Sequence, residues 1–133
     1  MLYRALYISH AKGNMGDDLR SVADIIGVSD RNNRREGLTG LLLYHGGRFL
    51  QVLEGPQGGI ERLLQTLSRD TRHDRLTLLS LAPASQRAFA AWSMAQAYIT
   101  PSVAPLLAGR DLGDLGATDA EALLRAAGVQ MDA

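Results

Sequence analysis

The order of strand-like and helix-like segments constrains the fold of this 133-residue chain more than any other feature. Six segments follow one another in the order strand, helix, strand, strand, helix, strand, at residues 2–9, 17–33, 38–44, 48–54, 56–70 and 75–82. Right-handed crossovers within each strand–helix–strand half place both helices on the same face of one sheet. The order therefore predicts an α+β fold with ferredoxin-like βαββαβ topology.

The central hairpin has the clearest local signal. Gly46 and Gly47 separate two strand-like runs and supply the positive φ angles of a tight turn. Pro56 then stands at the expected first position of the second helix, where a missing backbone N–H costs nothing. That helix ends near Asp70 and carries its apolar residues at helical spacing: Ile60, Leu63, Leu64 and Leu67.

The chain beyond the second half divides into one more strand and a tail. A fifth strand is expected at residues 92–99, after a loop at Pro83. Beyond Pro101 the composition shifts toward alanine, leucine and glycine, so we expect one domain at residues 1–99 and an extension at residues 100–133. The extension is too short for a core of its own. We therefore expect it to pack on the sheet or on a partner.

The end of the extension has a helix signal. Thr118 and Glu121 have the spacing of a capping box, which satisfies backbone N–H groups at the start of a helix. Gly128 marks the expected end, because glycine readily adopts the conformation that follows a helix. The pattern predicts a short helix between these points.

Charge and cysteine content argue against several classes of function. The 14 basic and 14 acidic residues cancel, so no global field favours nucleic acid or an anionic membrane. Without cysteine, the chain has no disulfide, thiol nucleophile or thiolate metal site. No apolar run approaches the roughly 20 residues of a membrane span, and the N-terminal residues lack a signal-peptide core. We expect a cytoplasmic protein without a membrane partner, and the sequence indicates no nucleic-acid partner.

The sequence also lacks the motifs of metal and phosphate chemistry. His10, His45 and His73 fall on three separate turns, with no HExxH or paired-carboxylate pattern, so no metal site is expected. Residues 55–59 (GPQGG) are a strand-to-helix turn rather than a phosphate-binding loop, because the lysine of that motif is missing.

Three polar side chains interrupt faces that would otherwise be apolar. Gln51 shares a strand face with Phe49 and Leu53, and an unpaired buried amide costs roughly 1–3 kcal/mol. Tyr7 lies on the first strand, where a buried hydroxyl needs a partner. Asn33 extends the apolar stripe of the first helix. Structural alternatives stay open: the face of Gln51 is the solvent side, Gln51 or Tyr7 is a satisfied core group, and Asn33 simply ends a helix.

Five segments, in this order along the chain, resemble the domains of the BLUF family. They are LYIS (6–9), RNNRREGLTGLLLY (31–44), RFLQVLEGP (48–56), RDTRH (69–73) and FAAWSM (89–94). The resemblance covers about residues 2–99. It implies a ferredoxin-like domain that holds a flavin between its two helices, over the sheet. The family uses FAD, so FAD is the expected cofactor, with FMN as an alternative.

The resemblance also implies roles for the residues that match family positions. Tyr7 matches the photoactive tyrosine, Gln51 the switching glutamine, and Asn33 the amide that holds the polar edge of the flavin. Trp92 and Met94 match the variable output pair on the fifth strand. Four further residues match positions near the flavin or its ribityl and phosphate chain: Asn32, Asp70, Arg72 and His73.

The mechanism implied by the resemblance is a light-driven hydrogen-bond switch. After excitation by blue light, an electron and a proton pass from Tyr7 through Gln51, and the pair recombines once Gln51 has changed orientation or tautomer. The signal then leaves through the fifth strand and the tail. No catalytic domain follows residue 99, so the resemblance implies a sensor without enzymatic activity, which signals to a separate, unidentified protein and self-associates.

Two other functions remain compatible with the same element order, because fold does not fix function. One is an acylphosphatase-like hydrolase, which would need an arginine in the loop after the first strand. That loop offers His10, Lys12 and Asn14 but no arginine. The other is a flavin-free interaction module in which Tyr7 and Gln51 are satisfied core groups.

Overall fold

The computed structural model describes residues 2–11, 35, 37–68, 73–89, 95–97, 99–107 and 109–132. The helix expected at residues 17–33 lies outside this part of the chain. The elements are β1 (Leu2–Ala11), β2 (Thr39–His45), β3 (Arg48–Pro56), α2 (Gln57–Ser68), β4 (His73–Pro83), β5 (Ala95–Ala97), the 3₁₀ helices η2 (Ala104–Leu106) and η3 (Leu112–Asp114), and α3 (Ala117–Asp132).

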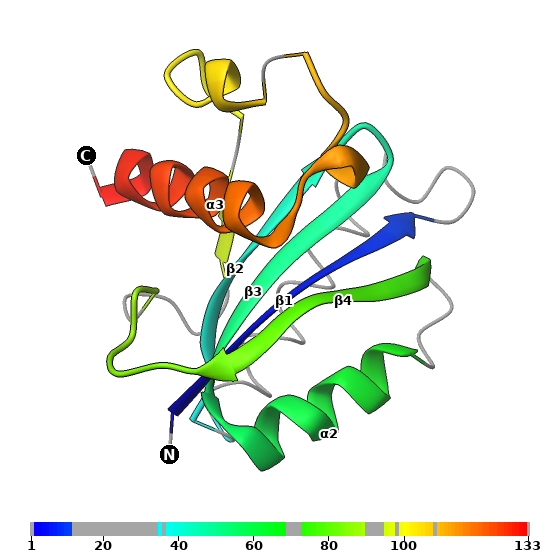
Figure 1. The fold of residues 1–133 in the computed structure, drawn as a ribbon, viewed down its shortest axis with the longest axis vertical. Coiled ribbons are helices and arrows are strands. Elements are labelled where there is room, and N and C mark those ends of the chain that lie inside the picture. The colour runs from blue at the N-terminus through cyan, green and yellow to red at the C-terminus, as the bar shows by residue number, and fades with distance from the viewer. Residues whose placement is uncertain are drawn as a thin grey trace.

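One five-stranded sheet, in the order β4-β1-β3-β2-β5, forms the centre of the molecule (Figure 1). β1 pairs antiparallel with both β3 and β4, and β2 pairs antiparallel with β3. β5 adds to the edge of the sheet parallel to β2. This α+β arrangement with ferredoxin-like topology confirms the fold class predicted from the order of the sequence patterns.

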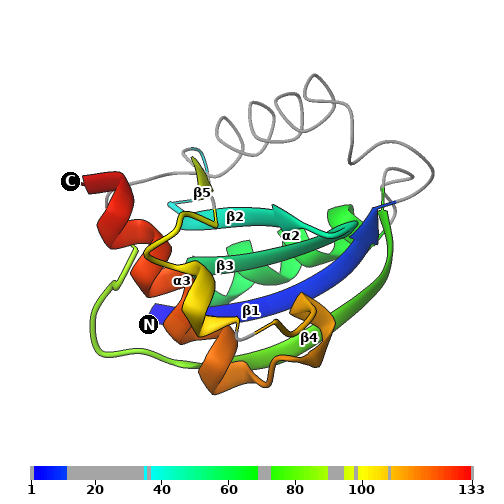
Figure 2. The same cartoon turned by 90° about the horizontal axis from the view of Figure 1, so that it is seen from above.

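The sheet is covered on both faces, with α2 on one side and α3 on the other (Figure 2). Side chains alternate between the faces along each strand. On β1, Ala5 and Tyr7 join the core beneath α2, whereas Leu6 and Ile8 join the core beneath α3. The side chains of β1 thus divide between the two cores in strict alternation.

The C-terminal part of the chain belongs to the second of these cores. Val103, Leu107, Leu112 and Leu115 lead into α3, which contributes buried residues at helical spacing: Ala120, Leu123, Leu124 and Ala127. A polar contact adds to this packing, since Asp111 before η3 pairs with Arg48 at the start of β3. The extension thus lies on the sheet.

The hairpin turn is as predicted. Gly46 and Gly47 have φ angles of 60° and 78°, values at which a side chain would be strained. Pro56 differs from the prediction: it is the last residue of β3, opposite Leu2 of β1, and α2 begins at Gln57. The pairing of β1 with β3 thus includes Pro56, the residue at which the sequence pattern places the start of the helix.

The later elements differ more from the sequence patterns. β5 is described only at Ala95–Ala97, where three residues pair with β2, and residue 99 is no longer in a strand. α3 begins at Ala117, so Thr118 lies inside the helix rather than before it. It also continues past Gly128 to Asp132, because buried Leu124 and Ala127 anchor the turn that enters the glycine.

Candidate functional site

The two polar side chains singled out on the first and third strands lie next to each other. Tyr7 of β1 and Gln51 of β3 are direct partners in the antiparallel register. Directly opposite residues have Cβ atoms roughly 4.5–5.5 Å apart and point to the same face of the sheet. That face is the one beneath α2, because the strand neighbours Phe49 and Leu53 belong to the same core as Tyr7.

Both side chains are buried: Tyr7 is 1% exposed and Gln51 is 4% exposed. The solvent-side alternative for Gln51 is therefore wrong. Within the described part of the chain, the hydroxyl of Tyr7 has no hydrogen-bond partner, and neither does the hydroxyl of Ser9, two residues further along the same face. Buried hydroxyls without partners are uncommon in folded proteins. These two favour a polar ligand that approaches the sheet from the α2 side.

Burial also determines the protonation state of the tyrosine. Removal from water raises the pKa of Tyr7 well above its ordinary value, since the phenolate form loses its hydration. The phenol consequently keeps its proton throughout the neutral and mildly alkaline range. It can lose that proton readily only when another event, such as loss of an electron, makes the hydroxyl more acidic.

This raised pKa predicts a loss of stability at alkaline pH. The unfolded chain releases the Tyr7 proton above its ordinary pKa of 10.0, while the folded chain retains it. The contribution of Tyr7 to the free energy of unfolding is therefore fully present below pH 10 and falls above it, by at most about 1.4 kcal/mol per pH unit. Urea unfolding of the wild type and Tyr7→Phe, in the same flavin state, measures this as a difference. A difference that stays constant from about pH 8 to about pH 11 would contradict the assignment.

The other site residues predicted from the sequence are not brought together by the described structure. Six of them lie outside the described residues: Asn32, Asn33, Asp70, Arg72, Trp92 and Met94. His73 begins β4, where its backbone is paired with Ala11 of β1. Of the predicted site residues, only Tyr7 and Gln51 are thus brought together within the described part of the chain.

The sequence patterns missed Glu54, a carboxylate that is 0% exposed. It lies three residues after Gln51 on β3 and accepts hydrogen bonds from Arg4, Ala88 and Phe89. Its signal in the sequence is weak, since a glutamate at the end of a strand is usually solvated. Its burial becomes evident only in the structure, where it belongs to a run of strand residues buried on both faces of the sheet.

A buried tyrosine lies beside a buried amide, and two hydroxyls on the same covered face have no partner among the described residues. On a ferredoxin-like sheet, this arrangement is typical of a ligand-binding α+β domain. The chain belongs to the BLUF family: the family model described as sensors of blue-light using FAD matches residues 2–95. The protein is accordingly a blue-light sensor of the kind that binds FAD. This match favours the photosensor over the hydrolase and the flavin-free module.

Known proteins agree with this family. The photoactivated adenylate cyclase subunit alpha of Euglena gracilis is 31% identical over 98 residues, which cover 74% of this chain and 10% of that protein. The structure of BlsA in its photo-activated state matches with a TM-score of 0.89, 25% identity and coverage of 97% of this chain and 96% of the other. The dark-state structure of the BLUF protein BlrB matches with a TM-score of 0.80, 30% identity and coverage of 97% and 96%.

The extent of these matches differs between the two kinds of relative. The chain spans about a tenth of the length of the cyclase subunit, whereas it covers nearly all of the BlsA and BlrB chains. In the cyclase, the matching part is thus a small portion of a much larger protein. Among the described helices of this chain, none has the length and apolar character needed to cross a membrane.

Proposed function

We propose that Tyr7 and Gln51 are the photoactive pair of this blue-light sensor. One observation carries the proposal: the two residues face each other across β1 and β3, buried on one face, and Tyr7 brings a hydroxyl without a partner among the described residues. A redox-active phenol beside a primary amide is the chemical pair that a hydrogen-bond switch requires. No other described pair on this face of the sheet combines these groups.

Each side chain has a distinct part in the switch. Bound FAD supplies absorption of blue light and an excited-state electron acceptor. Tyr7 holds its proton at the phenol oxygen in the dark, because burial opposes the phenolate. Loss of an electron makes this phenol acidic, and Gln51 lies beside it to accept the proton. A primary amide carries both a donor and an acceptor, so rotation or tautomerisation of Gln51 reverses which of them it presents.

The remaining site residues complete the proposal. Asn33 holds the polar edge of FAD, and four residues lie near its ring or its ribityl and phosphate chain: Asn32, Asp70, Arg72 and His73. Trp92 and Met94 pass the change at Gln51 to β5. These roles rest on the family positions that the residues match, and the family membership supports them.

Output through another protein is the last part of the proposal. We infer that residues 1–99 sense light, that residues 100–133 pass the signal on, and that the chain has no catalytic activity of its own. The near-complete coverage of BlsA and BlrB, in contrast to the cyclases, supports a sensor that acts on a separate partner. Self-association and a cytoplasmic location belong to the same proposal, and the absence of cysteine is compatible with the location.

An absorption spectrum tests the proposed function. Purified protein, reconstituted with FAD if necessary, is expected to be yellow with the bands of oxidised flavin. Blue light should shift these bands to longer wavelength without bleaching them, because the hydrogen bonds change while the flavin is not consumed. The shift should reverse in the dark. Colourless protein that takes up neither FAD nor FMN would contradict the proposal, as would bound flavin that shows no reversible shift.

A further inference from the structure

We propose that Glu54 is a positioning residue that couples the photoactive pair to α3. This inference rests on the proposed function, because it concerns the route by which a change at Gln51 leaves the site. It adds a residue to that route which does not touch the photoactive pair. Gln51 and Glu54 are three residues apart on β3 and so point to opposite faces of the sheet. Glu54 therefore lies on the face that α3 covers.

The Glu54 carboxylate is surrounded by hydrogen-bond donors. Oε2 accepts from Arg4 Nε at 2.7 Å and from the backbone N–H of Ala88 at 2.9 Å. Oε1 accepts from the backbone N–H of Phe89 at 2.6 Å. An ionised carboxylate only accepts hydrogen bonds, so it satisfies all three donors at once, and an amide could not. These contacts fix one end of the connection between β4 and β5.

Phe89 forms the first of two links from Glu54 to α3. Its side chain is buried in the same core as Leu123 and Leu124 of α3. From the solvent side, the guanidinium of Arg125, also on α3, lies 5.9 Å from the centre of the Phe89 ring, within the range of a cation–π contact. The carboxylate that holds the Phe89 backbone therefore also sets the position of a ring on which α3 rests.

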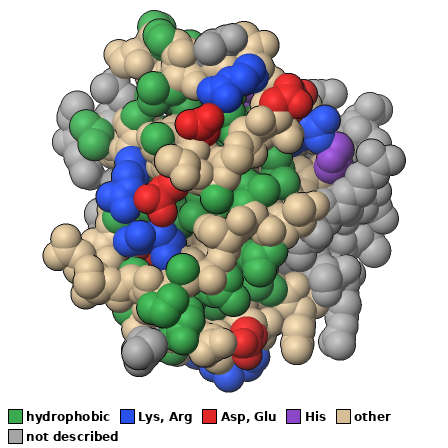
Figure 3. Space-filling view, in the orientation of Figure 1, with side chains coloured by type: hydrophobic (Ala, Val, Ile, Leu, Met, Phe, Trp, Pro, Cys, Tyr) green, Lys and Arg blue, Asp and Glu red, His purple; other side chains and the backbone are tan. Residues whose placement is uncertain are grey.

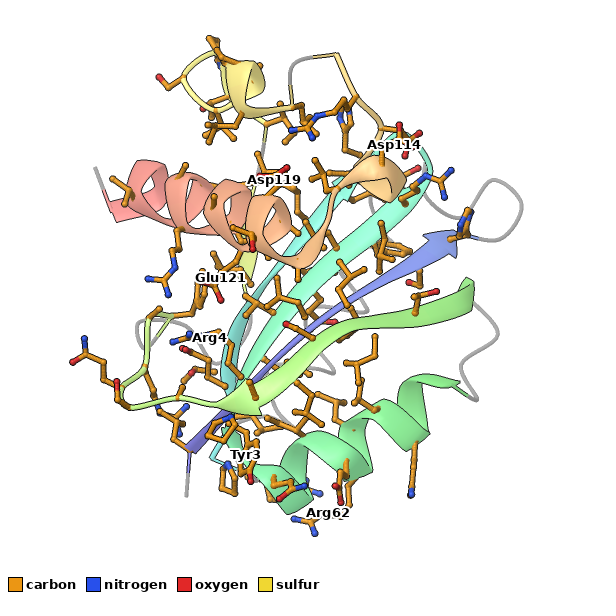
Figure 4. The ribbon with its side chains drawn as sticks, in the orientation of Figure 1. Tyr3, Arg4, Arg62, Asp114, Asp119 and Glu121 are labelled. Atoms are coloured by element: carbon orange, nitrogen blue, oxygen red, sulfur yellow. The ribbon has the colours of Figure 1, made fainter. Side chains whose placement is uncertain are left out.

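Arg4 forms the second link. Its Nη1 lies 3.6 Å from Oε1 of Glu121 on α3, while its Nε is bound to Glu54. Glu121 in turn accepts from Arg125 one helical turn later. Basic and acidic side chains gather on this face beside α3 (Figure 3), and Arg4 lies between the sheet and Glu121 (Figure 4). These ion pairs form a continuous series from buried Glu54 on the sheet to exposed Arg125 on α3.

Both links start at Glu54, which holds the backbone of Ala88 and Phe89 immediately before the expected output segment. The chain runs from Phe89 through residues 90–94, which include Trp92 and Met94 and lie outside the described residues, to β5, which is held by pairing with β2. The described residues on either side of this segment are each attached to the sheet. Glu54 holds one anchor and the β2–β5 pairing holds the other. We infer that the Glu54 anchor directs part of the light signal to α3.

The surroundings of Glu54 suit a substitution test. Arg87 donates to the backbone carbonyl of Glu54 at 2.9 Å, to the Thr39 hydroxyl at 2.7 Å and to the Gly37 carbonyl at 2.7 Å. These bonds do not involve the Glu54 side chain. They keep the β4–β5 connection attached to the sheet when the carboxylate is replaced. Glu54→Gln therefore breaks at least one of the three contacts and removes the charge that pairs with Arg4, while preserving side-chain shape.

The test combines two readouts on the full chain loaded with FAD. The reversible red shift of absorption reports the photoactive site, and light-dependent hydrogen exchange of the amides of α3 reports coupling. Glu54→Gln is expected to keep the red shift and to reduce the light-dependent difference in exchange by about fivefold or more. Glu121→Gln, which weakens the Arg4 link and the Glu121–Arg125 pair but leaves the contacts of the Glu54 carboxylate in place, should reduce it less. Asp119→Asn is the matched control, because it removes a similar ion pair with Arg110 from the first turn of α3 without touching Arg4.

The outcomes separate this inference from the proposed function. If the wild type shows no red shift, the proposed function fails; if it shows the shift but no light response in α3, only the inference fails. A Glu54→Gln protein that keeps both readouts at the level of Asp119→Asn also overturns the inference. Should Glu54→Gln not hold flavin, Glu121→Gln decides: a response below that of Asp119→Asn supports the coupling, and an equal response overturns it.

Discussion

The Gln51→Glu variant is expected to bind flavin and yet lose the lasting red-shifted state. Glutamate nearly preserves the shape of the side chain, so the packing against Phe49 and Leu53 should persist. Hydrogen bonding changes, however, because an ionised carboxylate only accepts and a protonated one donates through a hydroxyl. Neither form reproduces the reversal between donor and acceptor that the primary amide provides. We expect the stable photoproduct to be lost completely, rather than to form or decay at a different rate.

The protonation state of the new carboxyl affects how this result is measured. Burial raises the pKa of a carboxyl group, so the protonated form is favoured at this position and can shift the dark spectrum. Electron transfer in the variant is thus not the criterion. The criterion is a difference spectrum of the fully loaded variant after blue light, followed through dark recovery. Gln57→Glu, at an exposed position at the start of α2, is the control and should behave like wild type.

A normal red shift and recovery in Gln51→Glu would remove Gln51 from the mechanism. The protein would then remain a flavin-binding member of its family, but the proposed switch would have to lie elsewhere.

The Tyr7→Phe variant should retain flavin and lose the red shift entirely. The phenylalanine ring keeps the bulk that fills the core beneath α2, and only the electron- and proton-donating hydroxyl is removed. Because that hydroxyl has no partner among the described residues, its removal leaves no newly unsatisfied group among them. The free energy of unfolding of the flavin-free protein should therefore change by less than about 1 kcal/mol.

Absorption spectra and chemical unfolding together check this prediction. Tyr3→Phe is the matched control, since Tyr3 lies on the same strand and packs partly buried against the same core. It should keep the photocycle. A reversible red shift of normal size in Tyr7→Phe would show that another group donates the electron and proton. Strong destabilisation of the flavin-free variant would instead assign the hydroxyl a structural role.

The sheet, and the two residues that we propose as the photoactive pair, could be predicted from local sequence patterns. Alternation along the strands and the glycines of the hairpin are effects of neighbouring residues, so Gly46 and Gly47 could be placed correctly from the sequence. Tyr7 and Gln51 stood out because polar groups on an apolar face need partners. Their direct opposition could not be derived in the same way, because register depends on pairing between strands, and Tyr7 and Gln51 are 44 positions apart.

Glu54 shows why the rest could not be predicted. A glutamate is usually solvated, and nothing within a few residues of it explains its burial. Its partners Arg4, Ala88 and Phe89 come from 50, 34 and 35 positions away. Likewise, α3 passes through Gly128 because tertiary packing outweighs the roughly 1 kcal/mol by which glycine disfavours a helix interior. Both features arise only after distant segments have met.

The core beneath α3 also determines which residues must stay together if this sensor is joined to another protein. Half of its buried residues come from the sequence after residue 100, and the other half from the sheet, β5 and Phe89. A foreign effector joined to the chain at residue 99 would thus face an uncovered apolar surface, including Leu41, Leu50 and Val52. Transplanting the sensor intact requires the whole span to the end of α3. Substitutions on the outer surface of that helix can change which partner the domain binds, without replacement of the helix itself.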